Sequence, residues 1–361
     1  MVSETKVREV LSAVPYPGLK RDIVSLGLLR SVAVADDEVR VSLSVSSERS
    51  DVPGLLRSSV ETALKEQGAG RVQVDIVAPS LGRARGKDPW ADRAGIPGVA
   101  HVVVVGAGKG GVGKSTVAMN LALAFRDKGM SVGLLDADIY GPSIPMLLGL
   151  EDGSRDIQVT EERHIVPLKA HGLWVVSFGF FLGPGAPAVW RGPMVAKAVK
   201  QFSRGVRWPQ VDVLVVDLPP GTGDVPLSLA QNVMVDGAVV VTTPQRLAVQ
   251  EAERAIQMFD KLGVPILGLV ENMSYAECAC GRRSHPFGRG GTERLAQETG
   301  CPVIGQVPFD GTHVEGGDRG VPAFVTVPSG PAASAFRTMA EVLSEAIQGR
   351  ARSTGNPRSG G

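Results

Sequence analysis

The sequence predicts an α/β protein with a mostly parallel sheet flanked by helices, preceded by a small α+β domain. From His101 onward, short and continuously apolar runs are separated by helical patterns, which is typical of strands buried on both faces of a parallel sheet. Before residue 81, apolar and polar residues alternate instead, as they do in strands with one solvated face. The length of 361 residues exceeds what one compact core usually holds, so we expect two domains.

Residues 1–80 contain two helical and two strand patterns, as expected of a small α+β domain. "TKVREVLSAV" is the first amphipathic helix, and "GLLRSSVETALKEQG" is a second one stopped by glycine. "EVRVSLSVSS" and "RVQVDIV" are the strands, in which every second residue is apolar. The apolar face of the first helix consists of Val7, Val10, Leu11 and Val14.

Residues 81–97 are rich in glycine, proline and arginine without a period, and we expect them to form a linker. Residues 98–350 form the second domain, and residues 351–361 are expected to be a disordered tail. The last helix, "GPAASAFRTMAEVLSEAI", is expected to bury Phe336, Met339, Val342 and Ile347 on one face. The expected strands of this domain are "HVVVV", "SVGLLD", "LWVVSF", "VDVLVVD", "GAVVVTT", "PILGLV" and "PVIG".

The composition excludes several classes of function. The formal net charge of +1 gives no broad basic field, so a nucleic-acid partner is not expected. No run approaches the roughly 18 apolar residues of a membrane span, and no signal region opens the sequence, so we expect a cytoplasmic protein without membrane contact. Three cysteines are a sparse, odd set, which argues against a disulfide framework and fits a reducing cytosol.

The stretch "GAGKGGVGKST", residues 106–116, satisfies two phosphate-binding patterns. From Gly106 it reads G-x-G-x-x-G, a dinucleotide fingerprint, and from Gly108 it reads G-x-x-x-x-G-K-S, a P-loop. Only the P-loop requires a lysine for the β- and γ-phosphates and a hydroxyl for Mg²⁺, which Lys114 and Ser115 supply. The expected nucleotide contacts in this loop are Gly108, Lys109, Gly110, Gly111, Val112, Gly113, Lys114, Ser115 and Thr116.

A P-loop predicts further parts at the carboxyl ends of neighbouring strands. Asp217 ends one strand and is expected to hold Mg²⁺ together with Ser115. In the loop beyond it, the Gly221 N–H is expected to sense a γ-phosphate. Asp136 and Asp138 follow another strand. We expect Asp138 to orient the attacking water or a Mg²⁺-bound water, whereas a helix cap stays an open interpretation for Asp136.

The motifs "GKGGVGKST", "DADIYGPSIP" and "DLPPGTGD" resemble those of the deviant P-loop ATPases, the class of MinD, ParA and nitrogenase iron protein. With "ENMSY", they are most similar to the Mrp/ApbC iron–sulfur cluster carrier family, over roughly residues 98–348. The resemblance implies ATP as the nucleotide and a homodimer in which Lys109 reaches the partner's phosphates, so that Lys109, Lys114 and Asp138 act in catalysis. It also implies that Asn272, Pro308 and Asp310 flank adenine and ribose, with a strand-end cap as the alternative for Asn272.

The N-terminal zone resembles the small cluster-assembly domain often fused ahead of this ATPase, through "GLKRDIVSLGLL" and the strands after it. Two departures stand out. "PYPG" replaces the family's usual acidic pair before the glycine, and "SSERSDVPG" lacks its cysteine. We therefore expect a docking domain without metal chemistry of its own.

Cys278 and Cys280 are separated by one residue, where carriers of this family show C-x-x-C. Two thiolates per chain are half of what a [4Fe–4S] cluster takes, so a two-fold dimer would supply the set. The resemblance implies that such a labile cluster comes from scaffold or donor proteins and passes to apo iron–sulfur proteins. Successive thiolates of an extended C-x-C can point apart, which leaves two alternatives open: zinc bound with His285, or no metal. Cys301 is expected to be a buried small hydrophobe.

A MinD/ParA-like positioning or partition ATPase without a metal cluster is the alternative function. A membrane-positioning member should end in a basic amphipathic helix with large apolar residues. The last helix here holds Glu341, Glu345 and many alanines instead. A DNA-partition member should show a basic patch, which the near-zero net charge disfavours.

Overall fold

The computed structural model describes residues 4–15, 17, 22–24, 28–35, 38–44, 52–77, 93–151, 157–181, 192–278 and 280–353. The chain divides into two compact units, Met1–Asp88 and Pro89–Gly361. Most of the expected linker (81–97) and most of the expected tail (351–361) lie outside the described residues.

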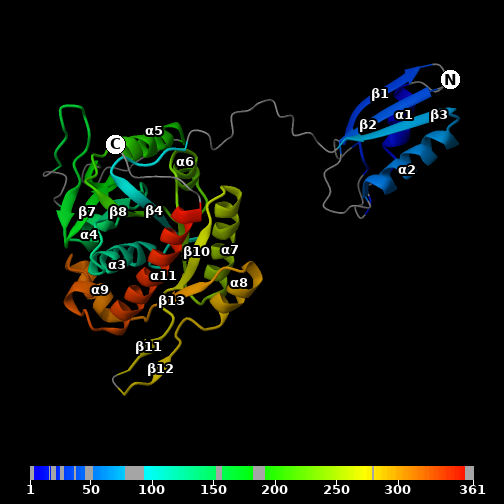
Figure 1. Cartoon of the computed structure of the whole chain (residues 1–361). Helices are drawn as coiled ribbons and strands as arrows, with labels where there is room; N and C mark the ends of the chain where they lie inside the picture. The colour runs from blue at the N-terminus through cyan, green and yellow to red at the C-terminus, as the bar shows by residue number, and fades with distance from the viewer. Residues whose placement is uncertain are drawn as a thin grey trace. The chain divides into compact units, whose positions relative to one another are not determined.

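The first unit packs two helices on one side of a three-stranded sheet (Figure 1). Its elements are α1 (Glu4–Leu11), β1 (Leu29–Ala35), β2 (Glu38–Ser44), α2 (Val52–Glu66) and β3 (Arg71–Val77). β2 is the central strand, antiparallel to β1 and parallel to β3. The alternation predicted for β2 is present, because Val39, Val41 and Leu43 are all buried against α1 and α2. β1 was not among the expected strands.

The second unit is built on an eight-stranded sheet in the order β13-β10-β9-β4-β8-β5-β7-β6. All neighbouring strands are parallel except the edge strand β6, which is antiparallel to β7. The predicted fold class is confirmed: the seven expected strands are all present, and β6 is added. Their bounds are β4 (Val99–Gly106), β5 (Val132–Asp136), β6 (Leu168–Ala170), β7 (Leu173–Ser177), β8 (Val211–Asp217), β9 (Gly237–Thr242), β10 (Ile266–Glu271) and β13 (Val303–Gln306).

Helices cover both faces of this sheet (Figure 1). One core joins the sheet to α3 and α11, through residues such as Phe125 and Phe336, and the other joins it to α5–α8, through residues such as Phe202 and Phe259. The helices are α3 (Lys114–Asp127), α4 (Ile144–Leu147), α5 (Gly192–Arg204), α6 (Asp224–Asn232), α7 (Arg246–Lys261), α8 (Gly291–Thr299), α9 (Gly311–Asp318), α10 (Ala323–Thr326) and α11 (Pro331–Ser353), with a 3₁₀ turn at Phe178–Phe181.

Two expectations about the last helix were wrong. Val342 is 40% exposed, whereas Phe336, Met339 and Ile347 are fully buried. A residue six positions after Phe336 lies about 120° around a helix with 3.6 residues per turn, whereas Leu343, seven positions after it, shares its face and is buried. Helix α11 also continues to Ser353, three residues into the segment expected to be disordered.

A two-stranded antiparallel hairpin, β11 (Ala276–Glu277) with β12 (Arg283–Ser284), extends away from the sheet of the second unit (Figure 1). No helix among the described residues is long and apolar enough to cross a membrane.

Candidate functional site

The polar residues selected from the sequence gather at the carboxyl edge of the eight-stranded sheet. The glycine loop follows β4, Asp217 ends β8 and Asp136 ends β5. Asp136 and Asp217 are paired in register on adjacent strands. Ligands of open α/β sheets bind at this edge, so the topology places the loop and both carboxylates where one ligand can meet them.

The structure explains why the glycine loop satisfies two patterns. A Cβ at Gly106 would lie 2.9 Å from Phe259 Cζ, and one at Gly108 would lie 1.9 Å from the Glu251 carbonyl oxygen. A side chain at Gly108 would therefore collide with the backbone of α7, and one at Gly106 would require the Phe259 ring to shift. Gly113 has a φ of 79° and precedes α3, which no side chain caps at this end. The first N–H groups of α3 are thus left for an anion, as a P-loop requires.

Lys114 is at the centre of a buried polar cluster. Its Nζ donates to Asp217 Oδ1 at 2.6 Å and to Ser115 Oγ at 3.1 Å, and lies 3.8 Å from Asp138 Oδ2. Burial raises the pKa of Asp217, and the Lys114 ammonium offsets part of that rise. The second carboxylate oxygen of Asp217 is buried with no hydrogen-bond partner among the described residues.

Asp136 and Asp138 are held by the turn that follows β5. Asp136 Oδ2 accepts from Ser177 Oγ at 2.9 Å and from the Ile144 N–H, the first of α4, at 3.2 Å. The helix-cap interpretation of Asp136 therefore agrees with the structure. Its pKa is raised to about 7, chiefly by burial and then by the charge of Asp217. Asp138 Oδ1 accepts from the N–H groups of Tyr140 and Gly141, both at 3.2 Å, which orients its carboxylate beside Lys114.

A cavity of about 170 Å³ adjoins the loop at Gly113 and Thr116. The three residues expected to flank the base and sugar, Asn272, Pro308 and Asp310, all line this cavity. Asn272 Nδ2 donates to the Val112 carbonyl oxygen at 2.9 Å, so this side chain also fastens β10 to the loop. Asp310 Oδ1 accepts from the Thr312 N–H at 2.9 Å and caps α9.

Sequence reasoning missed several residues that line the same cavity, among them Met273, Phe309 and His313. Burial lowers the pKa of His313. The aspartate of "FDGTH" is an N-cap signal, and recognising it would have predicted α9 and with it the position of His313.

Gly221 and Lys109 differ in how they are held. The Gly221 N–H, which was expected to sense a γ-phosphate, donates to the Ala107 carbonyl oxygen at 2.8 Å. It can meet a phosphate only after that bond breaks. The Lys109 side chain is half-buried and makes no hydrogen bond or ion pair within the described part of the chain.

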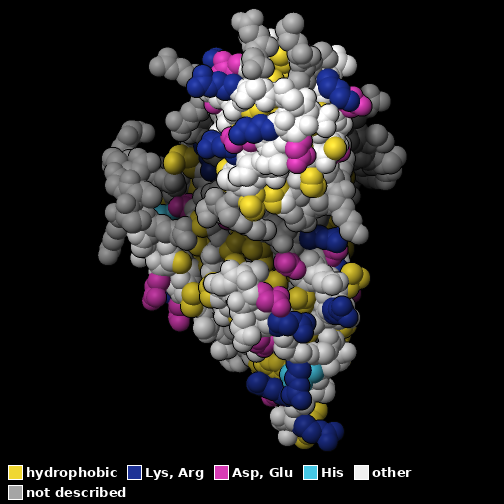
Figure 2. Space-filling model, turned by 90° about the vertical axis from the view of Figure 1, so that its right-hand side faces the viewer, with side chains coloured by type: hydrophobic (Ala, Val, Ile, Leu, Met, Phe, Trp, Pro, Cys, Tyr) yellow, Lys and Arg dark blue, Asp and Glu magenta, His cyan; other side chains and the backbone are white. Residues whose placement is uncertain are grey.

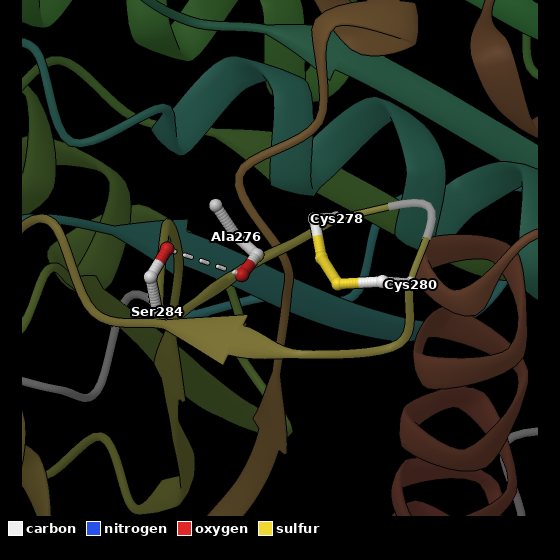
Figure 3. The surroundings of a disulfide bond; sticks show 4 residues. All are labelled: Ala276, Cys278, Cys280 and Ser284. Atoms are coloured by element: carbon white, nitrogen blue, oxygen red, sulfur yellow. Dashed lines mark hydrogen bonds between the residues drawn. A yellow bond between two sulfur atoms is a disulfide. The ribbon is translucent and has the colours of Figure 1, made fainter.

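The hairpin brings the two neighbouring cysteines together. The Cys278 N–H donates to the Arg282 carbonyl oxygen at 3.1 Å, and the Gly281 N–H donates to the Cys278 carbonyl oxygen at 2.8 Å. This turn directs both sulfurs to one side, where they form a disulfide with a Cα–Cα distance of 5.3 Å (Figure 3). The expectation that thiols of a C-x-C segment can point apart does not hold here. No disulfide was expected, and this one closes a local ring within the turn.

His285 is separated from the cysteines by the hairpin register. Ala276 pairs with Ser284, which places His285 beside Tyr275 and Arg282 beside Cys278. At about 3.3 Å per residue, His285 lies roughly 10 Å along the strand from Cys278. Within the described residues no group of three or more His, Cys, Asp or Glu is placed to hold a metal ion, so the zinc alternative finds no support. Cys301 is half-buried, not fully buried as expected.

The base of the hairpin is fixed to the wall of the cavity. The Ser274 N–H donates to the Val307 carbonyl oxygen at 2.9 Å, and the Phe309 N–H donates to the Tyr275 carbonyl oxygen at 2.6 Å. A ring nitrogen of His285 lies 3.0 Å from the Ser274 carbonyl oxygen, and the rings of Phe287 and Phe309 meet edge to face at 5.7 Å. Seven residues, Asn272 to Cys278, thus connect the loop contact to the first sulfur.

Comparisons with known proteins cover both units. Residues 98–344 match the model of the NUBPL iron-transfer P-loop NTPases, and residues 4–76 match that of the iron-sulfur cluster assembly proteins. The chain is 43% identical over 342 residues to the "Iron-sulfur cluster carrier protein" of Deinococcus radiodurans, covering 94% of each. It is 40% identical over 345 residues to the protein of that name from Escherichia coli K12, covering 93% of this chain and 90% of that one.

Among solved structures, a nucleotide-binding protein from Archaeoglobus fulgidus in complex with ADP is 39% identical, with a TM-score of 0.55. The similarity covers 62% of this chain and 87% of that one.

Proposed function

Since this chain belongs to the NUBPL iron-transfer P-loop NTPase family, we propose that it is an ATPase that carries a labile [4Fe–4S] cluster between two subunits and passes it to apo-proteins. The observation that carries this proposal is the direct connection between the phosphate loop and the cysteine hairpin. Asn272 bonds the loop through Val112, and the same segment continues into the turn that presents both sulfurs.

The phosphate loop supplies the groups that ATP hydrolysis needs. Backbone N–H groups at the start of α3 and the Lys114 ammonium bind the phosphates. Ser115 Oγ and the unpartnered oxygen of Asp217 suit Mg²⁺, which prefers oxygen ligands, and Mg²⁺ bound there would neutralise phosphate charge. Asp138, held beside Lys114, orients the attacking water. The cavity lined by Asn272, Pro308 and Asp310 takes the adenine and ribose.

A homodimer completes both halves of the site. Lys109 has no partner among the described residues, so it is available to a second subunit, where its charge stabilises the transition state in trans. Each chain offers two converging sulfurs, and a four-iron cluster takes four thiolates, so two hairpins related by a two-fold axis supply the set. The disulfide must first be reduced, because thiolates are the ligands.

Anaerobic reconstitution with iron and sulfide tests the carrier function directly. We expect about four irons per dimer in the reduced protein, and their loss in Cys278→Ala/Cys280→Ala. Cys301→Ala is the matched control, because Cys301 lies outside the hairpin and should leave the iron content unchanged. Iron and sulfide analysis and visible absorption are the readouts. Iron uptake that does not depend on Cys278 and Cys280 would refute the carrier function and leave a MinD/ParA-like ATPase.

A further inference from the structure

The cysteine hairpin carries more positive than negative charge. The hairpin, residues 276–284, contains Arg282 and Arg283 against a single carboxylate, Glu277, and Arg289 follows five residues after it. Figure 2 shows Lys and Arg side chains at the lower tip of the second unit, the end from which the hairpin extends in Figure 1. Because the whole chain has a formal net charge of only +1, this is a local concentration of charge.

One of the three arginines stiffens the hairpin. Arg283 Nε donates to Glu277 Oε2 across the strand pair at 2.8 Å, and its guanidinium lies 4.1 Å from the centre of the Tyr275 ring. Tyr275 is itself buried at the hairpin base. This arginine is therefore largely neutralised by its own neighbours.

The other two arginines remain available to a partner. Arg282 and Arg289 are exposed and form no ion pair or side-chain hydrogen bond with another described residue. Arg282 stands opposite Cys278 in the hairpin, bonded to it through the backbone at 3.1 Å. Any protein whose thiolates approach these sulfurs must also approach Arg282.

We propose that the exposed hairpin around Arg282, together with Arg289 in the segment that follows it, is the docking surface for an acidic protein that receives the cluster. The inference rests on the proposed carrier function and adds the chemistry by which the recipient is recognised. Free guanidinium groups beside a transfer site attract carboxylates and speed the encounter of correctly oriented partners. They also offset the repulsion between a thiolate-ligated cluster, which is anionic, and the incoming thiolates of the recipient.

Binding of an acidic acceptor tests the surface without any cluster. The probe is a small acidic apo-ferredoxin carrying a fluorophore, titrated with reduced full-length protein while anisotropy is measured at about 50 and about 200 mM salt. We expect Arg282→Glu/Arg289→Glu to weaken binding at low salt about tenfold and to abolish most of its salt dependence. ATP hydrolysis should be unchanged.

Lys128→Glu is the matched control, because Lys128 is an exposed cation at the far end of α3. This helix runs from the phosphate loop back toward the amino ends of the strands. It should change binding less than about twofold. A second control is the same apo-ferredoxin with its surface carboxylates converted to amides, which should bind weakly to every variant.

Equal binding by the wild type and the double arginine variant would overturn the proposal. Displacement of the ferredoxin by a single-stranded oligothymidylate would also overturn it, because the surface would then be a nucleic-acid site. Binding needs no cluster, so failure of cluster uptake and failure of docking are separate results.

Discussion

At the scale of single residues, the packing of α7 excludes a side chain at Gly108, and a side chain at Gly106 would require the Phe259 ring to move. Gly106 and Gly108 are closed off by Phe259 and by the Glu251 carbonyl of α7, and together with Gly111, whose φ is 79°, they complete the apparent dinucleotide fingerprint. A local motif cannot reveal that a helix more than a hundred residues later lies against it. The lysine and the hydroxyl of the motif distinguished the P-loop from the dinucleotide fingerprint, because only phosphate and metal binding requires them.

Asp136 predicts a pH dependence of stability. Its pKa is about 7 in the folded protein against an ordinary value of 3.8. Between these values the folded state binds more protons than the unfolded state, so this group's contribution, complete below about pH 4, is lost as the pH rises through 7. The upper limit of this contribution to the free energy of unfolding is about 4 kcal/mol. We expect Asp136→Asn to flatten the fall in thermal unfolding temperature between about pH 5 and 8.

The control for this prediction is Asp260→Asn, which changes an exposed carboxylate near the end of α7 and should leave the pH profile as it is. The readout is the slope of the unfolding temperature against pH, because the substitution also alters the bonds to Ser177 and Ile144 at every pH. A slope equal to that of the wild type would show that the titration of Asp136 does not contribute to the pH dependence of stability in this range.

At the scale of elements, the strands that could be predicted from the sequence are those with long, continuously apolar runs. The seven long apolar strands of the second unit were predicted because burial on both faces leaves an unmistakable pattern. β6 has three residues and the hairpin strands have two each, too few for any period to appear. The convergence of the two sulfurs depends on that hairpin turn, so the geometry of the cysteine site was beyond sequence reasoning, although its residues were identified.

Asn272 couples two elements, and we expect its removal to separate them. Asn272→Ala deletes the hydrogen bond to Val112, so nucleotide affinity should weaken by about tenfold. Nucleotide should slow amide exchange at Cys278 and Gly281 in the wild type, because both amides are bonded within the hairpin. In Asn272→Ala this slowing should disappear. Hydrogen–deuterium exchange with saturating nucleotide is the measurement.

Ser284→Ala serves as the control, because it removes a 3.4 Å hydrogen bond to Ala276 within the hairpin and leaves the connection to the phosphate loop intact. Its hairpin should still respond to nucleotide. If the hairpin of Asn272→Ala, saturated with nucleotide, is protected as in the wild type, the signal does not pass through this side chain.

At the scale of the whole molecule, two independent features of the second unit support the proposed pairing with a second copy. Lys109 carries a charge without a partner among the described residues, and the hairpin carries half the thiolates of a four-iron cluster. The lysine belongs to the loop after β4 and the cysteines follow β10. A single dimer would therefore complete catalysis and cluster binding together, which offers a reason for combining both on one chain.

Mixing two inactive variants tests whether Lys109 acts in the active site of the partner subunit. Lys109→Ala alone should lower ATP hydrolysis by roughly 10³-fold, and Lys114→Ala should abolish it. A mixed dimer has one intact site, with Lys114 from one subunit and Lys109 from the other. An equal mixture allowed to exchange subunits should therefore regain about a quarter of wild-type activity, since half of the dimers are mixed and each has one working site of two.

The control is Lys109→Ala mixed with Lys109→Ala/Lys114→Ala, which contains no Lys109 and should regain no activity. If both mixtures stay inactive although mixed dimers are present, Lys109 acts within its own subunit, and the dimer is then required by the cysteines alone.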